Sequence, residues 1–236
     1  MLYKFLGDIA EHDRDFETLK CEKFFASSFE SLNDPWDAPK NFIDRDSIKN
    51  LPNSQSRKLA TELLTKIDAF GIYCLSTENT SPLMWAHYAS NWRGLCIEYD
   101  YDGKEFFEEL RKTYSKDVFI SALPMKYLPT TTHINAIDLA TTAPLLIARY
   151  LFGQKKIDWG YEKEFRLIFN KSGLFHMPSL MISKVYLGYA MRPEQKNKYL
   201  KLFSGKGIPV FEAHPNITSN NSTVSLNFKP FDSTTP

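Results

Sequence analysis

The stretch SPLMWAHYASNWRGLCIEYD, residues 81–100, joins a predicted helix directly to a predicted strand. Ser81 is a favoured N-cap residue, and Pro82 suits the first helical turn. We expect Gly94 to end this helix, because glycine closes helices at little steric cost. The run LCIEYD, residues 95–100, then alternates with the period of a strand. This junction favours a fold in which helices and strands both belong to one core.

Similar patterns continue on both sides of this stretch. Predicted strands cover 2–6, 22–28, 72–76, 95–100, 161–170, 182–188 and 208–213, and predicted helices cover 15–19, 54–70, 81–93, 103–115, 138–152 and 193–203. The pattern predicts an α+β fold whose mixed sheet has about seven to nine strands, in one piece or split, with helices on its flanks.

We expect a single domain over residues 1–215, followed by a polar tail over residues 216–236. Within that tail, residues 223–229 alternate between apolar and polar side chains and can add an edge strand. A length of 236 residues is enough to bury a sizeable core.

Composition narrows the functional classes. The formal charge is +1, so no global field points to nucleic acid or to an anionic membrane. No run is long enough for a membrane span, and the first residues lack the apolar core of a signal peptide. The three cysteines have neither a CxxC pair nor a second ligand at metal spacing, which favours reduced cysteines, a cytoplasmic location and no metal centre.

The predicted helix after Ser81 is aromatic. Trp85 and Tyr88 fall on its broad apolar face and His87 lies at the margin of that face. One interpretation is an ordinary core helix. The other is the wall of a cleft in which these rings stack on a ligand. Glu98, in the middle of the next strand, is costly to bury unless it is paired or used in a site.

The second candidate constellation is WGYEKEFRLIF, residues 159–169. A strand period of two places Glu162, Glu164 and Arg166 on one face. This row is either an ion-pair ladder, for example between Arg166 and Glu98, or an acid/base or cation-stabilising carboxylate that Arg166 orients.

Two earlier segments contain further candidates. Asn33 and Asp34 stand before a proline in a strong turn signal, which is structural unless these side chains meet a ligand. Ser27 and Ser28 end a predicted strand and can present hydroxyl groups. Lys4 interrupts an apolar first strand, where it either reaches solvent or binds a phosphate or ribose.

Four stretches together resemble an uncharacterised bacterial and phage-associated family, known only as a domain of unknown function. They are SLNDPWD, LMWAHYA followed by RGLCIEYD, WGYEKEFRLIF and ISKVYLG. The resemblance extends over about residues 2–213. Because this family has no established activity, the resemblance implies none for this chain.

The order of polar residues also has a more distant similarity to ADP-ribosyltransferases. In that superfamily a basic first strand and a strand with Ser or Thr precede a strand with a catalytic Glu, often as Glu-x-Glu. Here Lys4, Ser27 with Ser28, and Glu162 with Glu164 fill this order, although Lys4 stands where Arg or His is usual. The resemblance implies an ADP-ribosyltransferase-like fold and NAD as the substrate.

The implied function is an NAD-consuming transferase, a toxin or an antiphage effector that acts on nucleic acid or protein. A fixed carboxylate stabilises the sugar cation formed when the glycosidic bond breaks, and Glu164 is the first choice for it. The further catalytic candidates are Glu162 and His87. The predicted nucleotide-binding residues are Lys4, Ser27, Ser28, Asn33, Asp34, Trp85, Tyr88, Glu98 and Arg166.

Two other functions stay open. A metal-dependent nuclease would use Asp34, His87, Glu98 and Glu164 with Mg²⁺ or Mn²⁺. A non-catalytic module would bind a nucleotide or a partner protein. The expected partners are therefore a small-molecule nucleotide, a nucleic-acid or protein acceptor and a partner or antitoxin protein, without a membrane.

Overall fold

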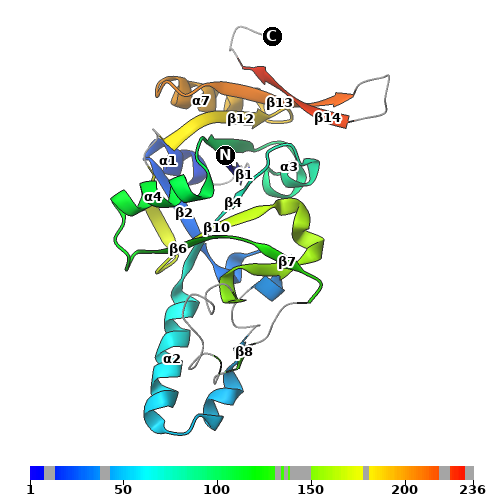
Figure 1. The fold of residues 1–236 in the computed structure, drawn as a ribbon. Helices are drawn as coiled ribbons and strands as arrows, with labels where there is room; N and C mark the ends of the chain where they lie inside the picture. The colour runs from blue at the N-terminus through cyan, green and yellow to red at the C-terminus, as the bar shows by residue number, and fades with distance from the viewer. Residues whose placement is uncertain are drawn as a thin grey trace. The chain divides into compact units, whose positions relative to one another are not determined.

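The computed structural model describes residues 1–7, 14–37, 43–130, 134–135, 138, 150–177, 181–217 and 224–231. Its strands and helices form an α+β fold, and Figure 1 shows their order along the chain. Among these described residues, ten strands hydrogen-bond into one mixed sheet, and two further pairs of strands stand apart from it. The predicted α+β class and mixed sheet are confirmed, whereas the sheet has one strand more than the upper expectation.

Contacts divide the chain into two compact units, each built from separate segments. Unit 1 comprises 1–24, 75–102 and 175–236, and unit 2 comprises 25–74 and 103–174. Strands β2 (Lys23–Ser28), β4 (Gly71–Ser76) and β11 (Gly173–His176) each begin in one unit and end in the other. The expectation of one domain over 1–215 stays a prediction.

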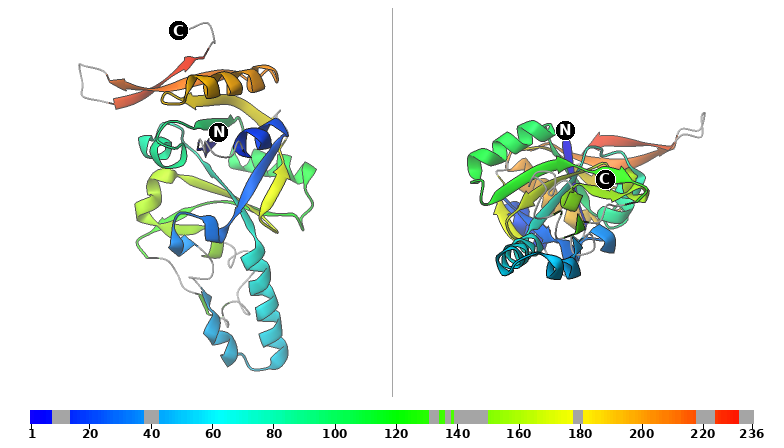
Figure 2. Two further views of the ribbon diagram at one scale, coloured as in Figure 1. Left: turned by 180° about the vertical axis from the view of Figure 1, so that it is seen from behind. Right: turned by 60° about the horizontal axis from the view of Figure 1, so that its bottom comes forward.

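Unit 1 holds strands that lie side by side in the order β1, β5, β12, β13 and β14. Its elements are β1 (Leu2–Leu6), α1 (Arg14–Lys20), α3 (Pro82–Tyr88), β5 (Leu95–Tyr99), β12 (Ile182–Gly188), α7 (Pro193–Ser204), β13 (Val210–Ile217) and β14 (Val224–Pro230). All neighbours in this order are antiparallel except β12 and β13. Helix α7 lies along β12 and β13 in Figures 1 and 2.

Unit 2 contains the paired strands β6 and β10 and two short parallel pairs. Its elements are η1 (Phe29–Ser31), η2 (Pro35–Asp37), β3 (Ile43–Asp44), η4 (Arg45–Asn50), α2 (Ser54–Ala69), α4 (Gly103–Thr113), β6 (Phe119–Pro124), β7 (Lys126–Leu128), β8 (Ile134–Asn135), β9 (Gln154–Lys156), η5 (Ile157–Glu162) and β10 (Glu164–Phe169). The label η marks a 3-10 helix. Figure 2 shows α2 leading into β4.

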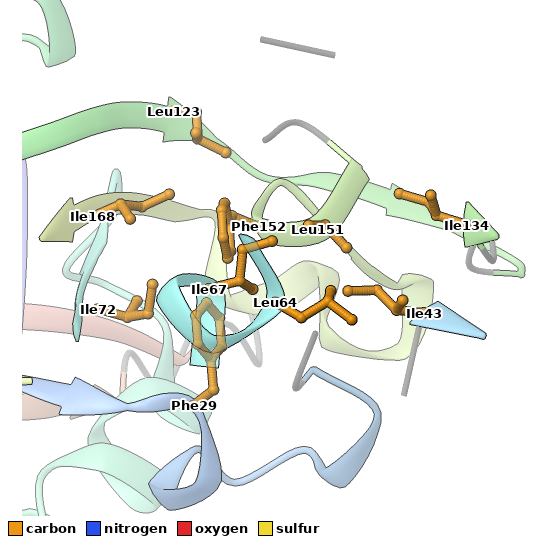
Figure 3. Packing of buried hydrophobic residues seen from close by; sticks show 10 residues of the cluster. All are labelled: Phe29, Ile43, Leu64, Ile67, Ile72, Leu123, Ile134, Leu151, Phe152 and Ile168. Atoms are coloured by element: carbon orange, nitrogen blue, oxygen red, sulfur yellow. The ribbon is translucent and has the colours of Figure 1, made fainter. Parts of the chain in front are cut away.

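The core of unit 2 gathers side chains from α2, β4, β6, β10 and the segments around them. Figure 3 shows its members, which are Phe29, Ile43, Leu64, Ile67, Ile72, Leu123, Ile134, Leu151, Phe152 and Ile168. Phe29 stacks on Phe152 with ring centroids 5.2 Å apart. Leu64 and Ile67 come from one face of α2, as the predicted amphipathic helix requires.

The strand predicted over 208–213 is shifted, since β13 covers Val210–Ile217. Two other predicted boundaries are wrong for local backbone reasons. The helix after Ser81 ends at Tyr88 and not at Gly94, because Ser90, Asn91 and Trp92 have positive φ angles. The strand predicted from residue 161 begins at Glu164, because a 3-10 helix precedes it. The helix predicted over 138–152 falls mostly outside the described residues.

Candidate functional site

Five buried charged side chains meet in unit 2, and we call them the carboxylate network. They are Asp37 of η2, Lys155 of β9, Glu162 of η5, and Glu164 and Arg166 of β10. None of the five is more than 6% exposed. Together they carry three negative and two positive formal charges.

Arg166 is the centre of this network. Its Nε donates to Glu164 Oε1 at 2.6 Å, and its Nη2 donates to Glu164 Oε2 at 3.1 Å. On the other side Nη1 donates to Asp37 Oδ1 at 2.8 Å, and Nη2 pairs with Asp37 Oδ2. One guanidinium therefore holds two carboxylates, that of Glu164 two residues away and that of Asp37 129 residues away in the chain. The ladder interpretation suggested Glu98 as its partner, but Asp37 and Glu164 are the partners observed.

Lys155 joins the third carboxylate to the other two. Its Nζ lies 2.6 Å from Glu162 Oε2, 3.3 Å from Glu164 Oε2 and 3.5 Å from Asp37 Oδ2. The two glutamates reach this ammonium although they are not on one strand. Lys163 between them adopts a left-handed conformation with φ 43°, which turns the chain from η5 into β10. The period-two argument for Glu162 is thus wrong in its geometry, while the two carboxylates still converge.

The electrostatics of the network follow from burial and charge. Burial alone would raise the pKa of Glu164, but the charges of Arg166 and Lys155 outweigh it and hold this pKa below its usual value. Burial would lower the pKa of Lys155, yet Glu164, Asp37 and Glu162 raise it overall. The same balance raises the pKa of Arg166. Glu164, Lys155 and Arg166 are therefore charged at neutral pH.

Neighbouring groups position the network from outside. The Tyr127 hydroxyl accepts a hydrogen bond of 2.7 Å from the backbone N–H of Glu164. Asp34 forms a turn in which its Oδ1 accepts from the N–H of Trp36 and its carbonyl from the N–H of Asp37. The turn predicted at Asn33 and Asp34 thus places Asp37, and a ligand role for Asn33, which is exposed, or for Asp34 stays a prediction.

Aromatic rings and a second lysine border the network. Lys155 Nζ lies 4.8 Å from the centre of the Trp159 ring. The ring of Trp36, adjacent to Asp37 in the chain, is 53% exposed, and Lys156 Nζ lies 5.4 Å from its centre. The surface next to the buried charges therefore presents an aromatic ring with an ammonium group above it.

A second buried carboxylate, Glu98, lies in unit 1. Its Oε1 accepts from Ser183 Oγ at 3.0 Å and from Lys184 Nζ at 2.7 Å, and its Oε2 accepts from the Tyr186 hydroxyl at 2.5 Å. A register shift between β12 and β5 lets Ser183 and Lys184 both reach it. Burial would raise the pKa of Glu98, but these three donors lower it overall. Of the two alternatives for a carboxylate buried here, pairing is observed, and a ligand role for Glu98 stays a prediction.

The aromatic residues of α3 differ in their surroundings. Trp85 is fully buried, donates from Nε1 to the Asn79 carbonyl at 2.8 Å and stacks on Trp92 at 5.1 Å. These contacts match the core-helix interpretation. His87 is exposed and meets the half-buried ring of Tyr88 edge-on at 6.4 Å. Ligand roles for these three residues stay predictions.

The remaining candidates lie on β1 and β2. Half-buried Lys4 pairs in register with Ile97 of β5 in unit 1. Ser27 and Ser28 are half-buried in unit 2, where the Ser28 carbonyl accepts a hydrogen bond from Ser31 Oγ. Of the predicted residues, the structure thus brings together Glu162, Glu164 and Arg166 in one network.

Sequence reasoning missed Asp37, Lys155 and Tyr127. Asp37 stands at the end of the quoted turn stretch, where its nearness to Asp34 was the only signal. Lys155 is one of two consecutive lysines that a sequence pattern assigns to solvent. Tyr127 and Lys155 come together because they are register partners in the pairing of β7 with β9, which no local pattern in the chain indicates.

The part of the chain that the structure describes has neither a candidate metal centre nor a candidate membrane-spanning helix. No group of three or more His, Cys, Asp or Glu side chains there is placed to hold a metal ion. None of the helices described is both long and apolar enough to cross a membrane.

Comparison with known proteins gives one family match, over part of the chain. Residues 84–167 match a family described as a protein of unknown function (DUF2971). This segment includes Glu98, Lys155, Glu162, Glu164 and Arg166, and it confirms the resemblance to an uncharacterised family of unknown function. No curated protein and no solved structure matches the chain.

Proposed function

We propose that this chain, whose residues 84–167 match a family of unknown function, is an NAD-consuming enzyme with an ADP-ribosyltransferase-like fold and activity. The observation that carries the proposal is the carboxylate pair Glu162 and Glu164, which Lys155 and Arg166 hold by hydrogen bonds of 2.6 to 3.3 Å. A fixed pair of this kind, next to an exposed aromatic ring, suits a substrate that develops positive charge during the reaction.

The reaction breaks the bond between the anomeric carbon of the ribose and the nicotinamide nitrogen. Nicotinamide leaves with the bonding electron pair, and the ribosyl carbon becomes an oxocarbenium-like cation. A nucleophilic oxygen or nitrogen of the acceptor then bonds to that carbon and loses its proton. A carboxylate beside the cation lowers the barrier because its charge is already in place before the cation forms.

The sequence favours Glu164 as the carboxylate that meets this cation, whereas the contacts favour Glu162. Glu164 accepts hydrogen bonds from both Arg166 and Lys155, so two cations already balance its charge. The Glu162 carboxylate accepts a hydrogen bond of 2.6 Å from Lys155 Nζ. We therefore assign Glu162 to the sugar cation and Glu164 to positioning Glu162 through Lys155.

A second candidate is a module that binds a nucleotide without turnover. The observation that favours it is the burial of the two carboxylates, because Glu162 and Glu164 are only 3% and 5% exposed and a substrate does not reach them directly. Catalysis requires the substrate to displace part of the covering chain, whereas binding at the exposed Trp36 ring does not. A toxin or antiphage role, with a nucleic-acid or protein acceptor and an antitoxin partner, is part of the first proposal.

The test is incubation of the purified protein with NAD in EDTA, in the presence of protein or nucleic-acid acceptors, with chromatography of released nicotinamide. We expect Glu162→Gln to lower the release rate by about two to three orders of magnitude while melting near the wild-type temperature. Glu212→Gln is the control, a largely buried carboxylate in unit 1 that pairs with Lys196. NAD binding without nicotinamide release would establish the second candidate, and equal rates for wild type and Glu162→Gln would remove Glu162 from the mechanism.

A further inference from the structure

Unit 2 contains two pairs of neighbouring residues, Trp36 with Asp37 and Lys155 with Lys156. In each pair one side chain is buried in the carboxylate network and the other is more exposed. Asp37 is 2% exposed, while Trp36 before it is 53% exposed. Lys155 is 6% exposed, while Lys156 after it is half-buried. Successive side chains of a strand point to opposite faces, so Lys155 points into the network and Lys156 points out. The backbone segments that hold the network therefore also fix an outer pair, Trp36 and Lys156.

The outer pair has its own geometry. Lys156 Nζ lies 5.4 Å from the centre of the Trp36 ring, within the range of a cation–π contact. Such a contact keeps the ammonium beside the ring. Trp36 is 53% exposed, so part of its ring surface is open to a ligand. The turn formed by Asp34 fixes the backbone of Trp36 through a hydrogen bond of 2.9 Å.

The chemistry of the pair selects a ligand class. An aromatic base stacks on an indole face, and an ammonium group binds phosphate as a point charge. A ligand that satisfies both at once has an aromatic base and a phosphate, which is a nucleotide.

We propose that Trp36 and Lys156 bind the adenosine phosphate half of the substrate. The identification of that half rests on the proposed function, because a dinucleotide whose nicotinamide ribose lies at the carboxylates has only its adenosine end left for the outer pair. Trp36 stacks on the adenine, and Lys156 contacts the phosphate. The pair is a binding position and takes no part in bond cleavage.

Calorimetric titration with adenosine monophosphate and with adenosine tests this inference. We expect Trp36→Ala to weaken the binding of both probes by roughly one to two orders of magnitude, and Trp36→Phe to recover part of that loss. Lys156→Gln should weaken binding of the monophosphate and leave adenosine unchanged. The matched controls are Ile157→Ala, with 57% exposure, and Lys116→Gln, an exposed lysine; neither should alter either affinity.

The outcomes separate this inference from the proposed function. Wild-type protein that binds no adenosine monophosphate, or a Trp36→Ala variant that binds it as wild type does, overturns the role of the outer pair. If Trp36 governs binding of adenosine monophosphate but the wild-type protein releases no nicotinamide from NAD, the transferase proposal fails and the binding position stands. If NAD is consumed, Trp36→Ala should raise KM and leave kcat unchanged, and an unchanged KM contradicts the inference alone.

Discussion

Arg166 is fully buried, and a guanidinium removed from water is stable only where carboxylates replace its hydration. Asp37 and Glu164 provide four oxygen contacts, all charge-assisted. The value of such a network is not large net stability, because the cost of desolvating the charges offsets most of their attraction. The network joins η2 to β10, and loss of Arg166 leaves the buried Asp37 and Glu164 carboxylates with only the longer contacts to Lys155, of 3.5 and 3.3 Å, among the contacts described.

We predict that Arg166→Met lowers the free energy of unfolding by about 3–5 kcal/mol, because Asp37 and Glu164 lose their shared partner in a buried site. Lys184→Met is the matched comparison, since Lys184 also pairs with a buried glutamate but its side chain is 39% exposed. That loss should be about 1 kcal/mol or less. Urea unfolding of the two variants and the wild type measures both values. Equal losses would mean that burial does not set the importance of these pairs.

For single residues, the sequence predicts contacts between neighbours on one strand better than contacts between distant segments. The alternation around Glu164 correctly suggests that Arg166 lies beside it, because that contact needs only local strand geometry. The contact with Asp37 depends on how distant segments meet, and no spacing in the chain indicates it. For Trp85 even the role is left open by the sequence. An aromatic residue on a helix suits both a packed core and the wall of a ligand site, and only its burial in the structure shows that it packs in the core.

The junction between α3 and β5 explains why the opening stretch predicts its elements but not the length of the helix. Ser81 caps α3 through a contact with the Met84 N–H, and β5 covers Leu95–Tyr99, both close to expectation. Between them, three successive residues take positive φ angles of 48°, 55° and 68°, which no sequence preference of Ser, Asn and Trp predicts as a run. Tertiary contacts decide this turn, including the stacking of Trp92 on Trp85.

Gly94, just before β5, is packed so closely that it leaves no room for a side chain. A Cβ atom at this position would overlap the Leu6 carbonyl oxygen and lie 3.0 Å from the Cα atoms of Ala89 and Gly7. We predict that Gly94→Ala lowers the free energy of unfolding by at least about 1–3 kcal/mol, because backbone atoms have to move to admit the methyl group.

Gly205, after α7, is the matched control for Gly94. It has an ordinary right-handed helical conformation, with φ −62°, and its nearest Cβ neighbour would be 3.2 Å away. Gly205→Ala should change stability by only a few tenths of a kcal/mol. Chemical denaturation compares the two variants, and a Gly94→Ala protein as stable as Gly205→Ala would show that the junction relaxes freely.

The whole molecule combines two compact units with a chain that passes between them several times. Strands β2, β4 and β11 each contribute residues to both units, so neither unit corresponds to one continuous segment. Sequence patterns locate most of these strands but give no sign of the division, because strand periodicity does not change where a strand passes from one unit to the other. Whether residues 1–215 form one domain therefore depends on whether the two units unfold together.

We predict that the two units unfold in a single calorimetric transition, because a strand cannot lose order at one end without weakening its ladder at the other. Calorimetry of the wild type should give a van't Hoff enthalpy equal to the calorimetric enthalpy. The variants Arg166→Met, in unit 2, and Gly94→Ala, in unit 1, should each move that one transition to lower temperature without splitting it. If one variant produces a second, earlier transition while the main transition stays in place, the units unfold independently. The expected domain over residues 1–215 would then have to be divided at the shared strands.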